Sequence, residues 1–158
     1  MLIQEKLIQE KYLAKTLYDT DYNLWVLETV KQLEKREFNA LDLENLIEEV
    51  SDLSRRDKNK LKSLLRNLCE HLLKLAYWQA EFSRNQSHWK GEIVNFRKQI
   101  QDQLENSPSL KPYLRQIFEK CYQDGREIAS TRSALPLSTF PEKPIASLEQ
   151  ILDENWFS

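Results

Sequence analysis

The chain has 158 residues, of which only 2 are glycine and 5 are proline, and its formal net charge at pH 7 is −2. β-Sandwiches and barrels need many turns rich in Gly and Pro, and a phosphate-cradling loop needs clustered glycines. The composition therefore excludes these classes and favours a mostly helical protein. A chain of this length is typical of one domain, and a net charge near zero argues against bulk binding of nucleic acid.

The chain carries no sign of export or of a membrane anchor. Its first residues, M-L-I-Q-E-K, include charges too early for the apolar region of a signal peptide. No stretch reaches the roughly 18 uncharged apolar residues of a membrane helix. The 2 cysteines, Cys69 and Cys121, are too few for a disulfide framework in a chain of this size. We expect a cytoplasmic protein with reduced thiols and no membrane partner.

Apolar residues recur with helical spacing through the first half of the chain. The spacing predicts helices over 2–18, 22–37, 43–55 and 58–80. Three of these helices are preceded by side-chain oxygens that can cap free amides. These lie in the segment 19–21 and at Asp42 and Asp57. The inward face of the third helix is expected to hold Leu43, Leu46, Ile47, Val50 and Ser54. The fourth helix carries the strongest period, through Leu61, Leu64, Leu65, Leu68, Leu72, Leu75 and Ala76.

The second half of the chain continues the helical pattern, with clearer interruptions. The polar segment 83–88 is predicted to be a turn, and helices follow it to about Glu105 and over about 110–131. Three prolines make 133–146 an extended segment. Ser147 opens a capping-box pattern, S-L-E-Q, before a short helix at 148–153. The fold class is therefore an all-α bundle of about six main helices plus a short C-terminal helix.

Four polar side chains form a candidate cluster. Glu44 and Glu48 begin a carboxylate row that Asp52 continues, and His71 and Lys74 lie on the leucine-rich helix. Because a short connection joins the helices over 43–55 and 58–80, we expect them to be antiparallel, which would bring His71 towards Glu44. We therefore expect a polar core or a ligand site formed by Glu44, Glu48, His71 and Lys74. No metal is assigned, because the spacing differs from the Glu-x-x-His of di-metal bundles.

A second candidate site is the basic run formed by Arg55, Arg56, Lys58 and Lys62. Its cations could bind phosphate groups, or could pair with the carboxylate row or stay solvated. Catalytic constellations are missing: no glycine-flanked nucleophile exists, and Cys69 and His71 are too close in sequence on one helix to face each other. We therefore assign no catalytic residue and no cofactor.

An ordered set of motifs resembles a known family. The motifs are L-D-L-E-N-L-I-E-E-V (41–50), L-x-x-L-C-E-H-L-L-K (65–74), S-x-W (87–89), S-P-S-L (107–110), A-L-P (134–136) and S-L-E-Q-I-L-D-E (147–154). Together they resemble the domain-of-unknown-function family number 29, which is frequent in cyanobacteria and other bacteria. By position, the family's motifs map onto Glu44, Glu48, Glu49, His71, Lys74 and Trp89.

The resemblance implies an all-helical, cytoplasmic bacterial protein and supplies no activity. It runs from about Tyr18 to Glu154, so residues 1–17 are interpreted as an N-terminal helical appendage and 18–154 as a single all-α domain. By elimination we expect a non-enzymatic interaction or regulatory module that binds another protein or a second copy of itself. One alternative is a metal- or ligand-binding bundle at Glu44, Glu48 and His71. Another is phosphate or nucleic-acid binding through residues 55–66.

Overall fold

The computed structural model describes all residues, Met1–Ser158, and confirms the all-α fold class. It contains six α-helices, three short 3-10 helices and no strand. No helix combines the length and the apolar character that crossing a membrane requires. The chain divides into two compact units, Met1–Arg55 (unit 1) and Arg56–Ser158 (unit 2). The expected division into an appendage (1–17) and one domain (18–154) is a different one and stays a prediction.

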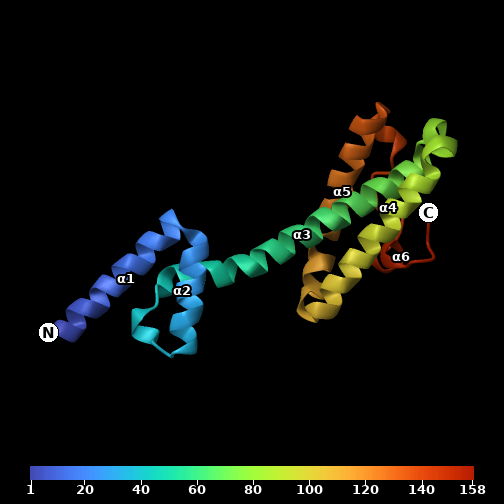
Figure 1. Cartoon of the computed structure of the whole chain (residues 1–158). Helices are drawn as coiled ribbons and strands as arrows, with labels where there is room; N and C mark the ends of the chain where they lie inside the picture. The colour runs from blue at the N-terminus through green and yellow to red at the C-terminus, as the bar shows by residue number, and fades with distance from the viewer. The chain divides into compact units, whose positions relative to one another are not determined.

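Unit 1 contains α1 (Leu2–Thr20), α2 (Tyr22–Glu34), the 3-10 helix η1 (Phe38–Ala40) and the first part of α3 (Leu43–Tyr77). The predicted cap between α1 and α2 is confirmed, because the Asp21 side chain accepts a hydrogen bond from the Leu24 amide at 3.0 Å. α1 ends at Thr20 and α2 begins at Tyr22, and Figure 1 shows the two helices joined at these ends. Asp42 likewise accepts from the Asn45 amide, at 3.4 Å, and so starts α3 as expected.

The predicted break at Asp57 is wrong, because α3 runs without interruption from Leu43 to Tyr77. Residues 53–60 are all exposed, and Arg and Lys, which favour helices, make up half of them. No Gly or Pro lies between Leu43 and Tyr77 to end the helix. An Asp in an exposed helix interior costs only a fraction of a kcal/mol, up to about 0.7, which is too little to interrupt the helix.

Unit 2 forms around the second part of α3, with α4 (Gln79–Asn106), α5 (Lys111–Ser133) and α6 (Leu148–Leu152). Figure 1 shows α4 returning beside this part of α3, with α5 on another side of it. Two 3-10 helices, η2 (Pro108–Leu110) and η3 (Leu137–Thr139), lie in the connections. Leucines of α3 form the centre of the core, and these are fully or almost fully buried: Leu61, Leu64, Leu65, Leu68, Leu72 and Leu75.

The turn predicted at 83–88 is also wrong, since these residues lie inside α4. The chain instead turns at Trp78, whose ring stacks on that of Trp89 with 5.5 Å between centroids. Polar residues alone do not end a helix when they can remain in solvent, and Ser83, Arg84 and His88 are exposed. The capping box at Ser147 and the short helix after it are confirmed.

Gly125 allows α5 to approach α3 closely. A Cβ atom at this position would lie 2.9 Å from the Arg66 carbonyl oxygen and 2.9 Å from the Glu70 amide nitrogen. Both are backbone atoms of α3, so neither can move aside without displacing the helix. Beside this contact the buried Cys121 thiol donates to the Lys62 carbonyl at 3.6 Å. The lack of a side chain at Gly125 therefore sets the distance between the two helices.

We predict that Gly125→Ala lowers the free energy of unfolding by about 1–3 kcal/mol, because the added methyl group forces the two helices apart. Gly91→Ala is the matched control. That site lies in α4 with no atom within 4 Å of the added carbon, so alanine should stabilise it by about 0.5–1 kcal/mol. Urea unfolding of both variants checks this, and a loss of stability of equal size in both would contradict it.

Candidate functional site

In unit 1, α3 is attached to the rest of the unit through its carboxylates. Glu49 accepts hydrogen bonds from the hydroxyl groups of Tyr18 and Tyr22, each at 2.7 Å. The bond to Glu49 raises the pKa of Tyr18 to about 12, which keeps this phenol protonated as a donor at any physiological pH. One carboxylate thus joins α3 to both α1 and α2.

Two further carboxylates make contacts on the same unit. Asp42, which is buried, accepts from the indole nitrogen of Trp25 at 3.3 Å. Glu44 pairs with Lys15 of α1 at 3.1 Å, in an exposed ion pair. Trp25 is itself buried and lies 4.9 Å from Tyr18, centroid to centroid. An aromatic and carboxylate network therefore holds the start of α3 in unit 1.

The apolar side of α3 in unit 1 is exposed to solvent, which contradicts the inward face predicted for residues 43–54. Leu43, Ile47, Val50 and Leu53 are each between 57% and 59% exposed, and we refer to these four residues as the apolar row. Their spacing of four, three and three residues keeps them on one side of the helix. Leu46 is half-buried, and Ser54 is exposed. The helix is thus amphipathic as predicted, but its polar side faces the unit.

The predicted cluster of Glu44, Glu48, His71 and Lys74 loses its geometric basis. It required a turn at Asp57, and α3 has none. Glu44 and Glu48 belong to unit 1, whereas His71 and Lys74 belong to unit 2. Glu44 pairs with Lys15 of α1, whereas Glu48 pairs with Arg55 of its own helix at 2.6 Å. Arg55 also pairs with Asp52.

His71 and Lys74 take part in a buried polar network of unit 2. Glu70, which is 1% exposed, accepts from Lys74 Nζ at 3.2 Å and from Arg132 of α5 at 2.7 Å. Lys74 Nζ also lies 5.6 Å from the ring centre of Trp89. The second carboxylate oxygen of Glu70 is buried without a hydrogen-bond partner. This network joins α3, α4 and α5.

His71 is a satisfied core histidine. Its Nδ1 lies 2.9 Å from the Asn67 carbonyl, to which the neutral imidazole donates, and its ring packs edge-on against Phe96. Burial lowers the pKa of His71 below its ordinary value of 6.5, and the nearby positive charge of Lys74 lowers it further. The hydrogen bond to Asn67 and the charges of Glu70 and Glu92 oppose this effect. The imidazole is therefore held neutral at physiological pH.

The residues of the predicted phosphate site have separate contacts. Arg55 is engaged by two carboxylates of unit 1. Lys58 lies over the ring of Tyr113 in unit 2, with 5.4 Å from its Nζ to the ring centre. Arg56 is exposed and Lys62 is half-buried. No group of three or more His, Cys, Asp or Glu side chains in the chain is placed to hold a metal ion.

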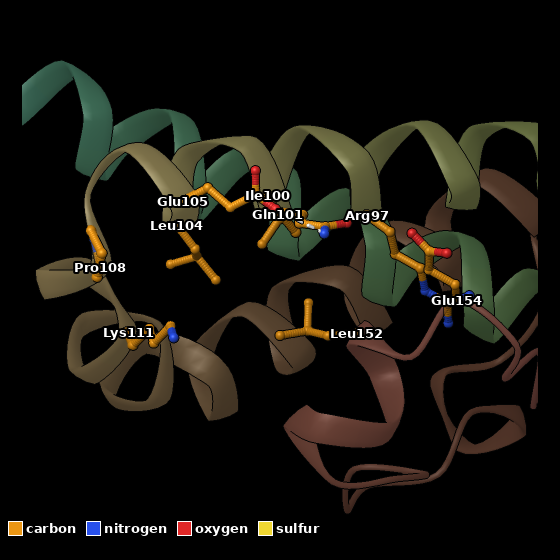
Figure 2. A pocket seen from close by; sticks show the side chains of 9 residues that line it. All are labelled: Arg97, Ile100, Gln101, Leu104, Glu105, Pro108, Lys111, Leu152 and Glu154. Carbon is orange, nitrogen blue, oxygen red and sulfur yellow. Dashed lines mark hydrogen bonds between the residues drawn. The ribbon is translucent and has the colours of Figure 1, made fainter.

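A groove in unit 2 lies beside a second buried cation, Arg97. The guanidinium donates to the carbonyls of Ile151 at 2.8 Å and Trp156 at 2.7 Å, so it ties the C-terminal segment to α4. The groove has a volume of about 350 Å³ (Figure 2). Its apolar lining comes from α4, α6 and the chain between α4 and α5, namely Ile100, Leu104, Pro108 and Leu152. Charged side chains of both signs surround it: Arg97, Glu105, Lys111 and Glu154.

Sequence reasoning missed several residues on which the two units depend. Glu70 precedes Lys74 by four residues, a spacing typical of helical ion pairs that could have indicated the contact. Glu49 was identified only through the family motif and not by its role as the acceptor of two tyrosine hydroxyls. Arg97 and Arg132 gave no local signal, because their partners lie more than fifty residues away in sequence.

We predict that His71 makes unit 2 less stable in mild acid. Below pH 6.5 the unfolded chain binds a proton that the folded chain resists, so the free energy of unfolding should fall as the pH decreases, by at most about 1.4 kcal/mol per pH unit. His71→Gln, which keeps a donor for the Asn67 carbonyl, should remove this part of the slope. Urea unfolding between pH 8 and pH 5 measures it.

The control variant His88→Gln removes an exposed imidazole and should keep the wild-type slope; an unchanged slope in His71→Gln would refute the assignment.

Comparison with known proteins agrees with the motifs. The family model described as "Domain of unknown function DUF29" matches residues 17–157, which is nearly the whole chain. A search of the curated proteins and of the solved structures found no match. The matched range includes Glu49 with its tyrosine partners, and the buried pair of Glu70 and Lys74. The chain therefore belongs to the DUF29 family.

Proposed function

We propose that the chain is a non-enzymatic protein-interaction module, and that a helix of a partner protein docks on the apolar row of α3. The observation that supports this is the orientation of α3 in unit 1, where the polar side of the helix, and not its apolar side, faces α1 and α2. Asp42, Glu44 and Glu49 contact α1 and α2, while Leu43, Ile47, Val50 and Leu53 remain exposed. A helix that serves only its own unit buries its apolar side and leaves its charges in water.

The row has the size and spacing that helix docking uses. Partner helices are recognised by apolar anchors at intervals of three and four residues, which is the spacing of the row. Complete burial of one such side chain is worth about 1.5–3 kcal/mol before the costs of association. Four side chains that are each more than half exposed can therefore contribute several kcal/mol of gross binding energy. Clustered exposed apolar side chains of this kind typically mark an interaction site.

The two alternatives have less support. A ligand site at Glu44, Glu48 and His71 depended on a turn in α3 that is absent. A phosphate site at 55–66 would begin with Arg55, and that side chain is already paired with Glu48 and Asp52. Neither alternative gives a reason for an exposed apolar row, whereas a docked helix does.

Selection from a displayed library of helical peptides tests the proposed docking surface. We expect peptides selected on the full chain to bind the wild type and to lose at least tenfold in affinity for Val50→Glu, which places a charge in the middle of the row. Ser51→Glu adds the same charge next to the row on an exposed position, and its affinity should stay within about twofold of the wild type, since roughly 1.4 kcal/mol corresponds to tenfold.

Two results would contradict the proposed function. One is that the selected peptides bind Val50→Glu as tightly as the wild type, which would place their site elsewhere. The other is that, without any peptide present, Val50→Glu lowers the melting temperature of the chain as much as Leu65→Glu does, a substitution in the centre of the core. Such a loss would mean that the row is part of the folded interior and not a docking surface.

A further inference from the structure

We infer that the partner helix is basic, with Lys or Arg on both sides of its apolar face; this rests on the proposed function and names the partner's chemistry. Unit 1 contains 12 Asp and Glu residues against 7 Lys and Arg residues, a net charge of −5. The whole chain has a net charge of only −2, so the excess of negative charge is concentrated in the unit that carries the row. Unit 2 holds 16 Lys and Arg residues against 13 Asp and Glu residues, a net charge of +3, so a cationic partner is drawn to unit 1 over unit 2.

The acidic groups lie beside the row itself. From Leu43 to Leu53, α3 carries four carboxylates and no cation, namely Glu44, Glu48, Glu49 and Asp52. Glu44 follows Leu43 and Glu48 follows Ile47, so both lie at the border of the row. Their side chains are 80% and 58% exposed. A helix that covers the row therefore places its flanking residues within reach of these two carboxylates.

The existing partners of these two carboxylates do not prevent this. Lys15 and Arg55 hold them in ion pairs whose four side chains are all more than half exposed. Exposed pairs contribute little to stability, because water and salt screen them. A partner cation that approaches over an apolar surface displaces water and can share the carboxylate. The exposed ion pairs thus keep the two acids in place without neutralising the surface.

A second copy of the chain fits the row less well. In a two-fold dimer the same surface faces itself, so the row of one copy would bring Glu44, Glu48 and Asp52 towards the same carboxylates of the other. Like charges placed across an interface oppose association and select against that partner. A basic helix satisfies the apolar row and its acidic border together, whereas a second copy satisfies only the row.

Three peptides derived from one binder selected on the row test the charge of the partner. They share one apolar face and carry Lys, Gln or Glu at the flanking positions. Fluorescence anisotropy with the full chain should give at least tenfold tighter binding for the Lys peptide than for the Gln peptide, and weaker binding still for the Glu peptide. The advantage of the Lys peptide should shrink as salt is raised, because added ions screen the attraction.

Variants of the chain locate the effect. Glu44→Gln with Glu48→Gln should remove most of the preference for the Lys peptide over the Gln peptide and leave binding of the Gln peptide unchanged. The matched control, Glu5→Gln with Glu34→Gln, removes two exposed acids of α1 and α2 and should keep most of the preference.

Failure of the charge preference and failure of the proposed docking surface give different results. If the three peptides bind equally and all lose affinity for Val50→Glu, the row docks a helix but the partner is not selected by charge, and the inference is wrong. If no binder depends on Val50, the proposed function itself fails. If sedimentation shows wild-type dimers that Val50→Glu dissociates, a second copy is the occupant, and the basic partner is rejected.

Discussion

One carboxylate attaches α3 to two other helices of unit 1. Glu49 accepts hydrogen bonds from two tyrosines on two different helices, and hydrogen bonds to a charged acceptor are about twice as strong as neutral ones. These bonds, with those of Asp42 and Glu44, determine which side of α3 faces α1 and α2. Because the carboxylates occupy that side, the four side chains of the apolar row point away from it. The exposed row is thus a consequence of the polar contacts.

The same helix behaves differently in the two units. In sequence, the apolar row continues the helical spacing of the leucine stripe that begins at Leu61. From Leu61 onward, α4 and α5 cover the stripe, and Gly125 allows α5 to come into backbone contact with α3. In unit 1 the apolar side chains of α3 have no comparable cover, as their exposure shows. The contrast supports an external partner for the row, because the chain covers the leucine stripe of unit 2 with its own helices and leaves the apolar row of unit 1 uncovered.

Much of the fold followed from the sequence, because local rules govern it. The caps at Asp21 and Asp42 and the capping box at Ser147 depend on side chains that bond to amides three residues away. Polarity alone is a poor indicator of a turn in this chain. Asp57 and the segment 83–88 lie inside helices, since exposed polar residues without Gly or Pro do not interrupt one. The absence of Gly and Pro before residue 90 was the better guide, and it favours long helices.

The candidate site could not be predicted to the same degree. Amphipathic spacing shows that a helix has an apolar side, but it does not show which side faces the rest of the unit. That choice depended on the hydroxyls of Tyr18 and Tyr22, whose contact with Glu49 spans about thirty residues of sequence. Likewise, the buried position of Glu70 depends on Arg132 of α5, which no local pattern indicates. Contacts of this kind are set by tertiary packing, which no short stretch of sequence contains.

The exposure of the apolar side of α3 in unit 1 can be measured by the rate at which a maleimide labels single cysteines introduced along this helix. The 2 native cysteines are buried, and burial raises the pKa of each thiol, so their background labelling is slow. In the folded protein we expect Ile47→Cys and Val50→Cys to react as fast as Ser51→Cys, which lies on the exposed border of the row. Labelling of Ile47→Cys and Val50→Cys as slow as that of buried Cys69 would contradict it.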